Sequence, residues 1–139
     1  MKKKTILVAD DSPIIRSVVK IYLRDYSIDF LEAETSERAL EILESQSIDL
    51  LIADQKVPGL GGVGLLSTLR GHAKQRLKSV PVILLASDRS HESELRSLGV
   101  EPSAVLMKPV SGARIVDRVK EILGNGSSGS SERLITNGN

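Results

Sequence analysis

The chain has 139 residues, with 19 lysine and arginine residues against 18 aspartate and glutamate residues, and it has no cysteine. This length suits one domain with a single hydrophobic core. The near-neutral charge provides no broad field that would attract nucleic acid or an anionic membrane, and the lack of cysteine excludes disulfides and thiolate chemistry. The longest apolar stretches, such as residues 82–86, are far shorter than the roughly 20 residues that cross a bilayer, so we expect no membrane partner and a cytoplasmic location.

Five short apolar runs recur along the chain, separated by longer stretches with helical spacing. Strands that are apolar along their whole length are typical of a parallel sheet covered on both faces. The predicted strands cover residues 6–9, 28–31, 50–53, 82–86 and 105–107. The second run contains Asp29 and is the most polar of the five, so we expect it at an edge of the sheet.

The first three helices are predicted from their start signals and apolar spacing. Ser12 is a candidate N-cap with Pro13 at the first helical position, which is a strong start signal. A second helix is predicted to begin near Ser36. A third is predicted to follow the glycines at positions 59–64 and to carry leucines over residues 65–69.

Two further helices are predicted in the second half of the chain. The fourth covers about residues 90–98 and has few large apolar residues, so we expect it to be the least firmly packed; Gly99 supplies its stop. The fifth runs from a Ser111 cap to residue 123. We therefore predict one domain over residues 1–123, followed by a flexible tail over residues 124–139 that is rich in glycine and serine.

The alternation of strands and helices predicts an α/β fold: a doubly wound, five-stranded parallel sheet between helical layers, with five helices. Ligands of such sheets bind outside the carboxyl ends of the strands. Those ends carry Asp10 and Asp11 after the first strand, Asp54 after the third, and Lys108 after the fifth. We therefore expect three carboxylates and one ammonium group to meet at one edge of the sheet.

Carboxylates held close together repel one another, so such a site takes up a proton or binds a cation. Mg²⁺ fits best, because it prefers oxygen ligands and is satisfied by a few protein oxygens together with water and phosphate. Asp11 and Asp54 are the predicted direct ligands. A carboxylate whose charge the metal offsets can attack phosphorus, and Asp54 is placed to form an aspartyl phosphate while Lys108 stabilises the transferring oxygens.

These residues together resemble the signature of the receiver domains of two-component signalling, over residues 4–123. The matching pieces are Asp10-Asp11, Asp54 with Val57-Pro58-Gly59 after it, and Lys108-Pro109. The resemblance implies a flavodoxin-like three-layer sandwich with strand order 2-1-3-4-5 and a cis Lys108-Pro109 bond. It also implies two further contacts to Mg²⁺, from the backbone carbonyl of Lys56 and from Asp10 through water.

The resemblance also implies a signalling domain rather than an enzyme, with self-catalysed phosphotransfer and dephosphorylation only. The phosphoryl group would come from a phosphohistidine on a histidine kinase or a histidine phosphotransfer protein. The output domain or target protein would bind the face formed by residues 90–98, 105–107 and 111–123. Nucleic acid is not an expected partner of this domain, and a homodimer is left open.

The sequence departs from the receiver pattern at the positions that usually relay phosphorylation. Ala86 stands where receivers carry threonine or serine, and Val105 stands where they carry an aromatic residue. Ser87 could replace the missing hydroxyl only if the fourth strand has already ended, because side chains alternate along a strand. At the rim of the site, Lys56 and Asp88 are predicted to form an ion pair that alters the rate of dephosphorylation.

Three alternatives remain from the sequence alone. The first is a pseudo-receiver that binds or dimerises without phosphorylation, which Ala86 and Val105 favour. The second is a phosphatase of the haloacid-dehalogenase type, although its two acids would be separated by one residue and Asp10 and Asp11 are adjacent. The third is a flavin-binding electron carrier, which the chain's scarcity of aromatic residues disfavours. His72 and His91 are predicted to be solvated, and the glycines after Asp54 are assigned no chemistry.

Overall fold

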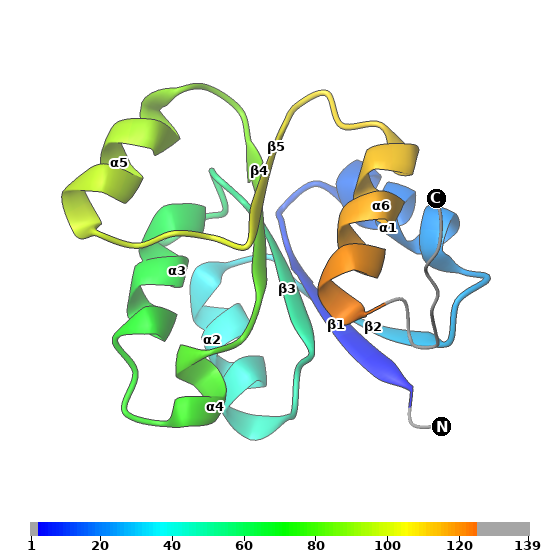
Figure 1. The fold of residues 1–139 in the computed structure, drawn as a ribbon, viewed down its shortest axis with the longest axis horizontal. Coiled ribbons are helices and arrows are strands. Elements are labelled where there is room, and N and C mark those ends of the chain that lie inside the picture. Colours follow the sequence, from blue (N-terminus) through cyan, green and yellow to red (C-terminus); the bar gives the residue numbers. More distant parts are fainter. Residues whose placement is uncertain (1–2, 125–139) are drawn as a thin grey trace.

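A computed structural model of the chain describes residues 3–124. It is a five-stranded sheet with helices on both faces, and every strand pairing is parallel (Figure 1). The strands are β1 (Lys4–Ala9), β2 (Ile28–Ala33), β3 (Leu50–Asp54), β4 (Val82–Ala86) and β5 (Ala104–Met107). The helices are α1 (Pro13–Leu23), α2 (Ser36–Ser45), α3 (Gly61–Arg70), α4 (Gln75–Lys78), α5 (Ser90–Leu98) and α6 (Gly112–Leu123).

The strand order is β2-β1-β3-β4-β5, which confirms the predicted topology and places the polar strand β2 at an edge. The order reverses between β1 and β3, which are direct neighbours in the sheet. In open α/β sheets this reversal is where loops diverge and leave room for a ligand. The ends of β1 and β3 carry Asp10 and Asp54, so the topology alone brings these two carboxyl groups together.

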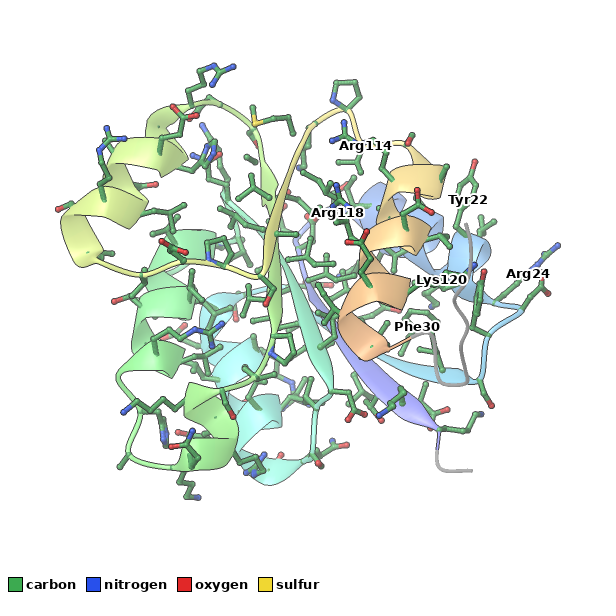
Figure 2. All side chains as sticks on the ribbon, in the orientation of Figure 1. Tyr22, Arg24, Phe30, Arg114, Arg118 and Lys120 are labelled. Atoms are coloured by element: carbon green, nitrogen blue, oxygen red, sulfur yellow. The ribbon has the colours of Figure 1, made fainter. Side chains whose placement is uncertain are left out.

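The core consists of two layers, one on each face of the sheet. Alternate residues of each strand point to opposite faces, so Leu7 and Ala9 pack toward one layer while Ile6 and Val8 pack toward the other. The first layer is closed by α2, α3 and α4, with α5 alongside, and the second by α1 and α6. On the side of α1 and α6, Figure 2 shows Tyr22, Arg114, Arg118 and Lys120 around the outer surface. This is the three-layer sandwich that the sequence predicts.

The predicted N-cap positions of the first and last helices are confirmed, but at α1 the hydrogen bond differs from a side-chain cap. Ser12 occupies the N-cap position and Pro13 begins the helix, yet the Ser12 side chain makes no capping hydrogen bond. Its backbone N–H instead donates to Asp10 Oδ1 at 2.7 Å. Ser111 caps α6 as predicted, because its Oγ accepts from the Arg114 N–H at 3.2 Å. The predicted tail, residues 124–139, lies outside the described residues except for Gly124, which follows α6 in the left-handed conformation.

The prediction of five helices is short by one, because the brief helix α4 precedes β4. Four residues are too few to show a helical apolar period, so tertiary contacts define this segment. Leu77 is buried, and the Arg76 guanidinium donates to the carbonyls of Leu43 and Gln46, each at 2.9 Å. These carbonyls lie at the C-terminal end of α2, where helical carbonyls lack partners within the helix.

Two local predictions are wrong. The third helix does not follow the glycines but begins with them, since α3 starts at Gly61. His91 is not solvated: it is 4 % exposed, and its Nδ1 lies 2.7 Å from the backbone oxygen of Asp88. In α5 it is His91 that is buried, whereas Leu98 is half exposed, as expected for a loosely packed helix. Among residues 3–124, no helix combines the length and the apolarity needed to span a membrane.

Gly62 holds α3 against the end of β3. A Cβ atom at this position would lie 2.6 Å from both the backbone oxygen of Asp54 and a methyl group of Leu84. Gly62→Ala is therefore expected to destabilise the fold by about 1–3 kcal/mol, the usual range for overpacking a core. Chemical denaturation measures this change. Gly71→Ala is the matched control, because its added Cβ would make only ordinary contact at 3.6 Å, and an equal loss in both variants would contradict the expectation.

Candidate functional site

Asp54 ends β3 and is 4 % exposed. Its Oδ1 accepts a hydrogen bond from the Lys56 N–H at 2.7 Å, and its Oδ2 forms an ion pair with Lys108 Nζ. Lys108 follows β5, and its N–H donates to the Ala86 carbonyl at 2.8 Å, which extends the pairing of β5 with β4. The peptide bond between Lys108 and Pro109 is cis, as the resemblance implied. The ends of β3 and β5 thus bring a carboxylate and an ammonium group into direct contact.

Asp10 is the most deeply buried acid of the site, with no exposed surface. Its N–H donates to the Ala33 carbonyl at 2.9 Å, which places the residue directly beyond β1. Oδ1 accepts from Ser12 N–H, whereas Oδ2 is buried and has no hydrogen-bond partner. Burial raises the pKa of Asp10 from 3.8 to about 6, and the nearby charge of Asp54 adds to the increase.

Asp11 directly follows Asp10 in the chain but lies in different surroundings. Its neighbour Asp10 is buried beside Asp54, whereas Asp11 itself is exposed. Among residues 3–124, no three acidic or histidine side chains stand close enough together to hold a metal ion as they are. The structure therefore brings together Asp10, Asp54 and Lys108, and it does not add Asp11 to that cluster.

The donor set nevertheless fits a hard divalent cation. A buried carboxylate oxygen without a hydrogen-bond partner is unfavourable, and Asp10 Oδ2 is such an atom next to a second carboxylate. A cation at this position would satisfy that oxygen and offset the repulsion between the two acids. The assignments of Asp11 and the Lys56 carbonyl as ligands stay predictions.

The relay positions lie where the sequence placed them, at the end of β4 and within β5. Ala86 is the last residue of β4 and is fully buried. Ser87 lies beyond the strand and is exposed, so the condition for it to replace the hydroxyl is met. Its N–H is committed to Gln55 Oε1 at 2.8 Å. Val105 lies within β5, opposite Leu84, and is half-buried.

Lys56 and Asp88 form the ion pair that the sequence predicts, with 3.0 Å between Nζ and Oδ2. Hydrogen bonds from Ser90 and the contact with Lys56 hold the pKa of Asp88 well below its ordinary value, so this carboxylate stays charged. The pair joins the residue two positions after Asp54 to the loop after β4. Any role in the rate of dephosphorylation stays a prediction.

Sequence reasoning missed Gln55, although it directly follows Asp54. Its side chain is buried, and it forms hydrogen bonds to three residues at the start of α5 and in the loop before it: Ser87, Asp88 and Ser90. A lone glutamine carries no motif, and these partners lie more than 30 positions away. The only signal in the sequence was a second polar residue, directly after Asp54, at the end of a strand that is otherwise apolar.

Comparison with known proteins agrees with this geometry. Residues 6–120 match the model of the response regulator receiver domain, which is most of the described chain. The chain belongs to the response regulator receiver domain family. Receiver domains work with histidine kinases and output domains in two-component systems, so this chain is a domain of that signalling class.

The relatives differ in how much of their own length this chain matches. The chain is 29 % identical over 135 residues to the phosphate regulon transcriptional regulatory protein PhoB of Pseudomonas aeruginosa, and it spans 58 % of that protein's length. It is 28 % identical over 118 residues to the chemotaxis protein CheY of the same organism, covering 84 % of this chain and 94 % of CheY. A putative response regulator from Chloroflexus aurantiacus superposes with a TM-score of 0.78 at 29 % identity, covering 88 % of this chain and 99 % of that one.

Proposed function

We propose that this receiver domain accepts a phosphoryl group on Asp54 from a phosphohistidine, with Mg²⁺ as cofactor. The observation that carries the proposal is the buried Asp54 carboxylate, paired with Lys108 and adjacent to the unpartnered oxygen of Asp10. A structural ion pair would not need a second buried acid beside it. A phosphoryl acceptor does, because the second acid helps to hold the cation that brings phosphate to a negatively charged nucleophile.

The residues of the chain have separate parts in the transfer. An oxygen of Asp54 forms a bond to phosphorus while the bond from phosphorus to the donor's imidazole nitrogen breaks, and the electron pair leaves with that nitrogen. Lys108 donates hydrogen bonds to the phosphoryl oxygens, on which negative charge collects. Asp10 and Asp54 would hold Mg²⁺, with Asp11 and the Lys56 carbonyl as further ligands, and the metal would supply positive charge to the same oxygens. Hydrolysis of the aspartyl phosphate returns the carboxylate.

A pseudo-receiver is the second candidate, and two observations favour it. Ala86 has no hydroxyl to donate to a phosphoryl group. Val105 has no aromatic ring that could change position when the phosphoryl group is present. In that case the domain would bind partners in one state only. The retained acids and Lys108 support the phosphorylated form instead, because a binding module has no need for an unpaired buried carboxylate oxygen.

The proposed partners follow from this role. The phosphodonor would be a histidine kinase or a histidine phosphotransfer protein, and the output domain or target would bind the face of α5, β5 and α6. That face exposes Leu98 and Met107. Relatives include the PhoB regulator and the autoinducer 1 sensor kinase/phosphatase LuxN of Vibrio harveyi, 27 % identical over 125 residues, so receiver domains of this kind occur in several contexts. The cytoplasmic location and a homodimer stay predictions.

Intact mass measurement tests the proposal. The protein is incubated with acetyl phosphate, which releases acetate on transfer, in the presence of Mg²⁺ or of a chelator. We expect the wild type to gain one phosphoryl group only with Mg²⁺, and Asp54→Asn to gain none. Asp49→Asn, which changes an aspartate at the opposite end of β3, is the control and should behave as wild type. A wild type that stays unmodified with every small phosphodonor would favour the pseudo-receiver.

Removing the ion pair at the rim is expected to shorten the lifetime of the aspartyl phosphate. In Lys56→Met the ion pair with Asp88 is lost from the rim, so we expect water to approach the phosphoryl group more freely and hydrolysis to become several-fold faster. Stability should change by less than about 1 kcal/mol, because both side chains are largely exposed. The decay of the phosphorylated mass measures the lifetime. Lys20→Met, which breaks the ion pair between Lys20 on α1 and Glu32 on β2, is the control, and an unchanged lifetime in Lys56→Met would refute this role.

A further inference from the structure

Gln55 connects the end of β3 to the loop between β4 and α5 through both the oxygen and the nitrogen of its side-chain amide. Oε1 accepts from the N–H groups of Ser87 at 2.8 Å and Asp88 at 3.2 Å. Nε2 donates to Asp88 Oδ1 at 3.1 Å and to Ser90 Oγ at 2.9 Å. The residue is 7 % exposed, so these hydrogen bonds are shielded from water and losing one leaves a buried polar group unsatisfied.

The backbone of Gln55 is fixed as firmly as its side chain. Its N–H donates to the Leu85 carbonyl at 2.8 Å, and its carbonyl accepts from Gly62 N–H at 2.9 Å. The first bond ties it to β4 and the second to the start of α3. The side chain therefore extends from a rigid base, and a shift of the strand end at Asp54 moves the amide group with it.

The loop after β4 has few other attachments. Residues 87–89 also form hydrogen bonds with α5. Within residues 3–124, their other polar side-chain contacts are the hydrogen bonds to Gln55 and the Lys56–Asp88 ion pair. Gln55 and Lys56 are the two residues that directly follow Asp54. Asp54 Oδ1 also accepts from the Lys56 N–H, so a change at this carboxylate acts on the same short segment.

The far end of these contacts is the beginning of α5. Asp88 Oδ1 accepts from the Ser90 N–H at 2.9 Å, and the Asp88 carbonyl contacts the buried ring of His91 at 2.7 Å. Both Ser90 and His91 lie in the first turn of α5. A displacement of the loop therefore displaces the first turn of this helix, which is the least buried of the longer helices that cover that face of the sheet.

We propose that Gln55 is a positioning residue that couples the state of Asp54 to α5 through the loop at residues 87–90. It does so in a chain whose residue at the end of β4, Ala86, has no hydrogen-bonding side chain. The role of this coupling in signalling rests on the proposed function. The coupling itself requires only the hydrogen bonds of Gln55. The link predicts that α5 responds much less to a change at Asp54 when the Gln55 amide is absent.

The test compares amide NMR spectra of the full chain with Gln55 and with methionine in its place. Gln55→Met keeps the length of the side chain and removes all four hydrogen bonds. Gln75→Met is the control, since Gln75 is an exposed residue of α4 remote from Asp54. The state of Asp54 is changed in two ways, by acetyl phosphate with Mg²⁺ and by the substitution Asp54→Asn, which requires no phosphorylation.

With Gln55 present, both changes at Asp54 should shift the amide resonances of β3 and of residues 90–98. With methionine at position 55, the shifts in β3 should persist while those in residues 90–98 are at least halved. Intact mass should show that the phosphoryl group is still accepted. A purely structural role would instead alter both regions together, so the contrast between β3 and α5 is the diagnostic signature.

An α5 response of wild-type size in Gln55→Met would overturn the inference and leave the proposed function intact. If the wild type accepts no phosphoryl group, the proposed function fails, yet the Asp54→Asn comparison still decides whether Gln55 provides the coupling. Gln55→Glu covers the case in which the methionine variant does not fold. It keeps the acceptor for the amides of Ser87 and Asp88 and loses the donor to Asp88 and Ser90, so we expect a weakened response; a full one would count against the proposal.

Discussion

Replacing Lys108 with methionine is expected to slow phosphorylation of Asp54 by roughly 100- to 1000-fold, the usual cost of losing one preorganised group that stabilises transition-state charge. Lys108 Nζ contacts Asp54 Oδ2 directly, and its side chain is 27 % exposed. It therefore stands in a partly dry environment where its charge is weakly screened. Methionine keeps most of the apolar length and removes the charge, so the variant isolates the electrostatic contribution.

The rate is measured as the appearance of the phosphorylated mass with acetyl phosphate and Mg²⁺. Lys74→Met, at an exposed lysine before α4, is the matched control and should retain the wild-type rate. Lys108→Arg keeps the charge with a different shape and should recover part of the rate. Thermal unfolding in parallel shows whether each variant is folded. Phosphorylation of Lys108→Met at the wild-type rate would remove Lys108 from the proposed chemistry.

Without divalent metal, the protein is expected to lose stability as the pH rises through about 6, because Asp10 then loses its proton inside the fold. Burial raises the pKa of Asp10 from 3.8 to about 6, so the folded state favours the neutral acid. The resulting stabilisation is complete below the unfolded-state pKa and disappears as the pH passes the folded-state value. At 1.36 kcal/mol for each pKa unit, the free energy of unfolding at neutral pH is expected to be about 3 kcal/mol lower than below the unfolded-state pKa.

Denaturant unfolding at a series of pH values, with a chelator present, measures this loss. The difference between wild type and Asp10→Asn isolates the contribution of Asp10, because other acids contribute equally to both proteins. Asp25→Asn, at an exposed aspartate, should follow the wild type at every pH. Mg²⁺ should reduce the loss at neutral pH, since a bound cation favours the ionised Asp10. Parallel curves for wild type and Asp10→Asn would show that Asp10 is already ionised in the metal-free fold.

The sequence alone determined the architecture, because the evidence for it is local and periodic. Apolar runs such as residues 82–86, interrupted by helical spacing, predict a covered parallel sheet, and the ends of those runs predict which side chains meet. Asp10, Asp54 and Lys108 follow three different strands and converge in the structure. The order of the strands followed from the family resemblance rather than from periodicity.

Other features depended on contacts between distant residues, which no local pattern records. Helix α4 exists because Leu77 is buried and Arg76 binds the end of α2.

The same division holds at the site. The residue types and their spacing determined that Asp54 would have a lysine and a second acid beside it, since the ends of parallel strands share one edge of the sheet. Only the tertiary structure decided that Asp10 Oδ2 lacks a partner and that Gln55 bridges to the loop before α5. The reason is physical: burial and hydrogen bonding are set by which segments pack together, and those segments lie more than 30 positions apart in the chain.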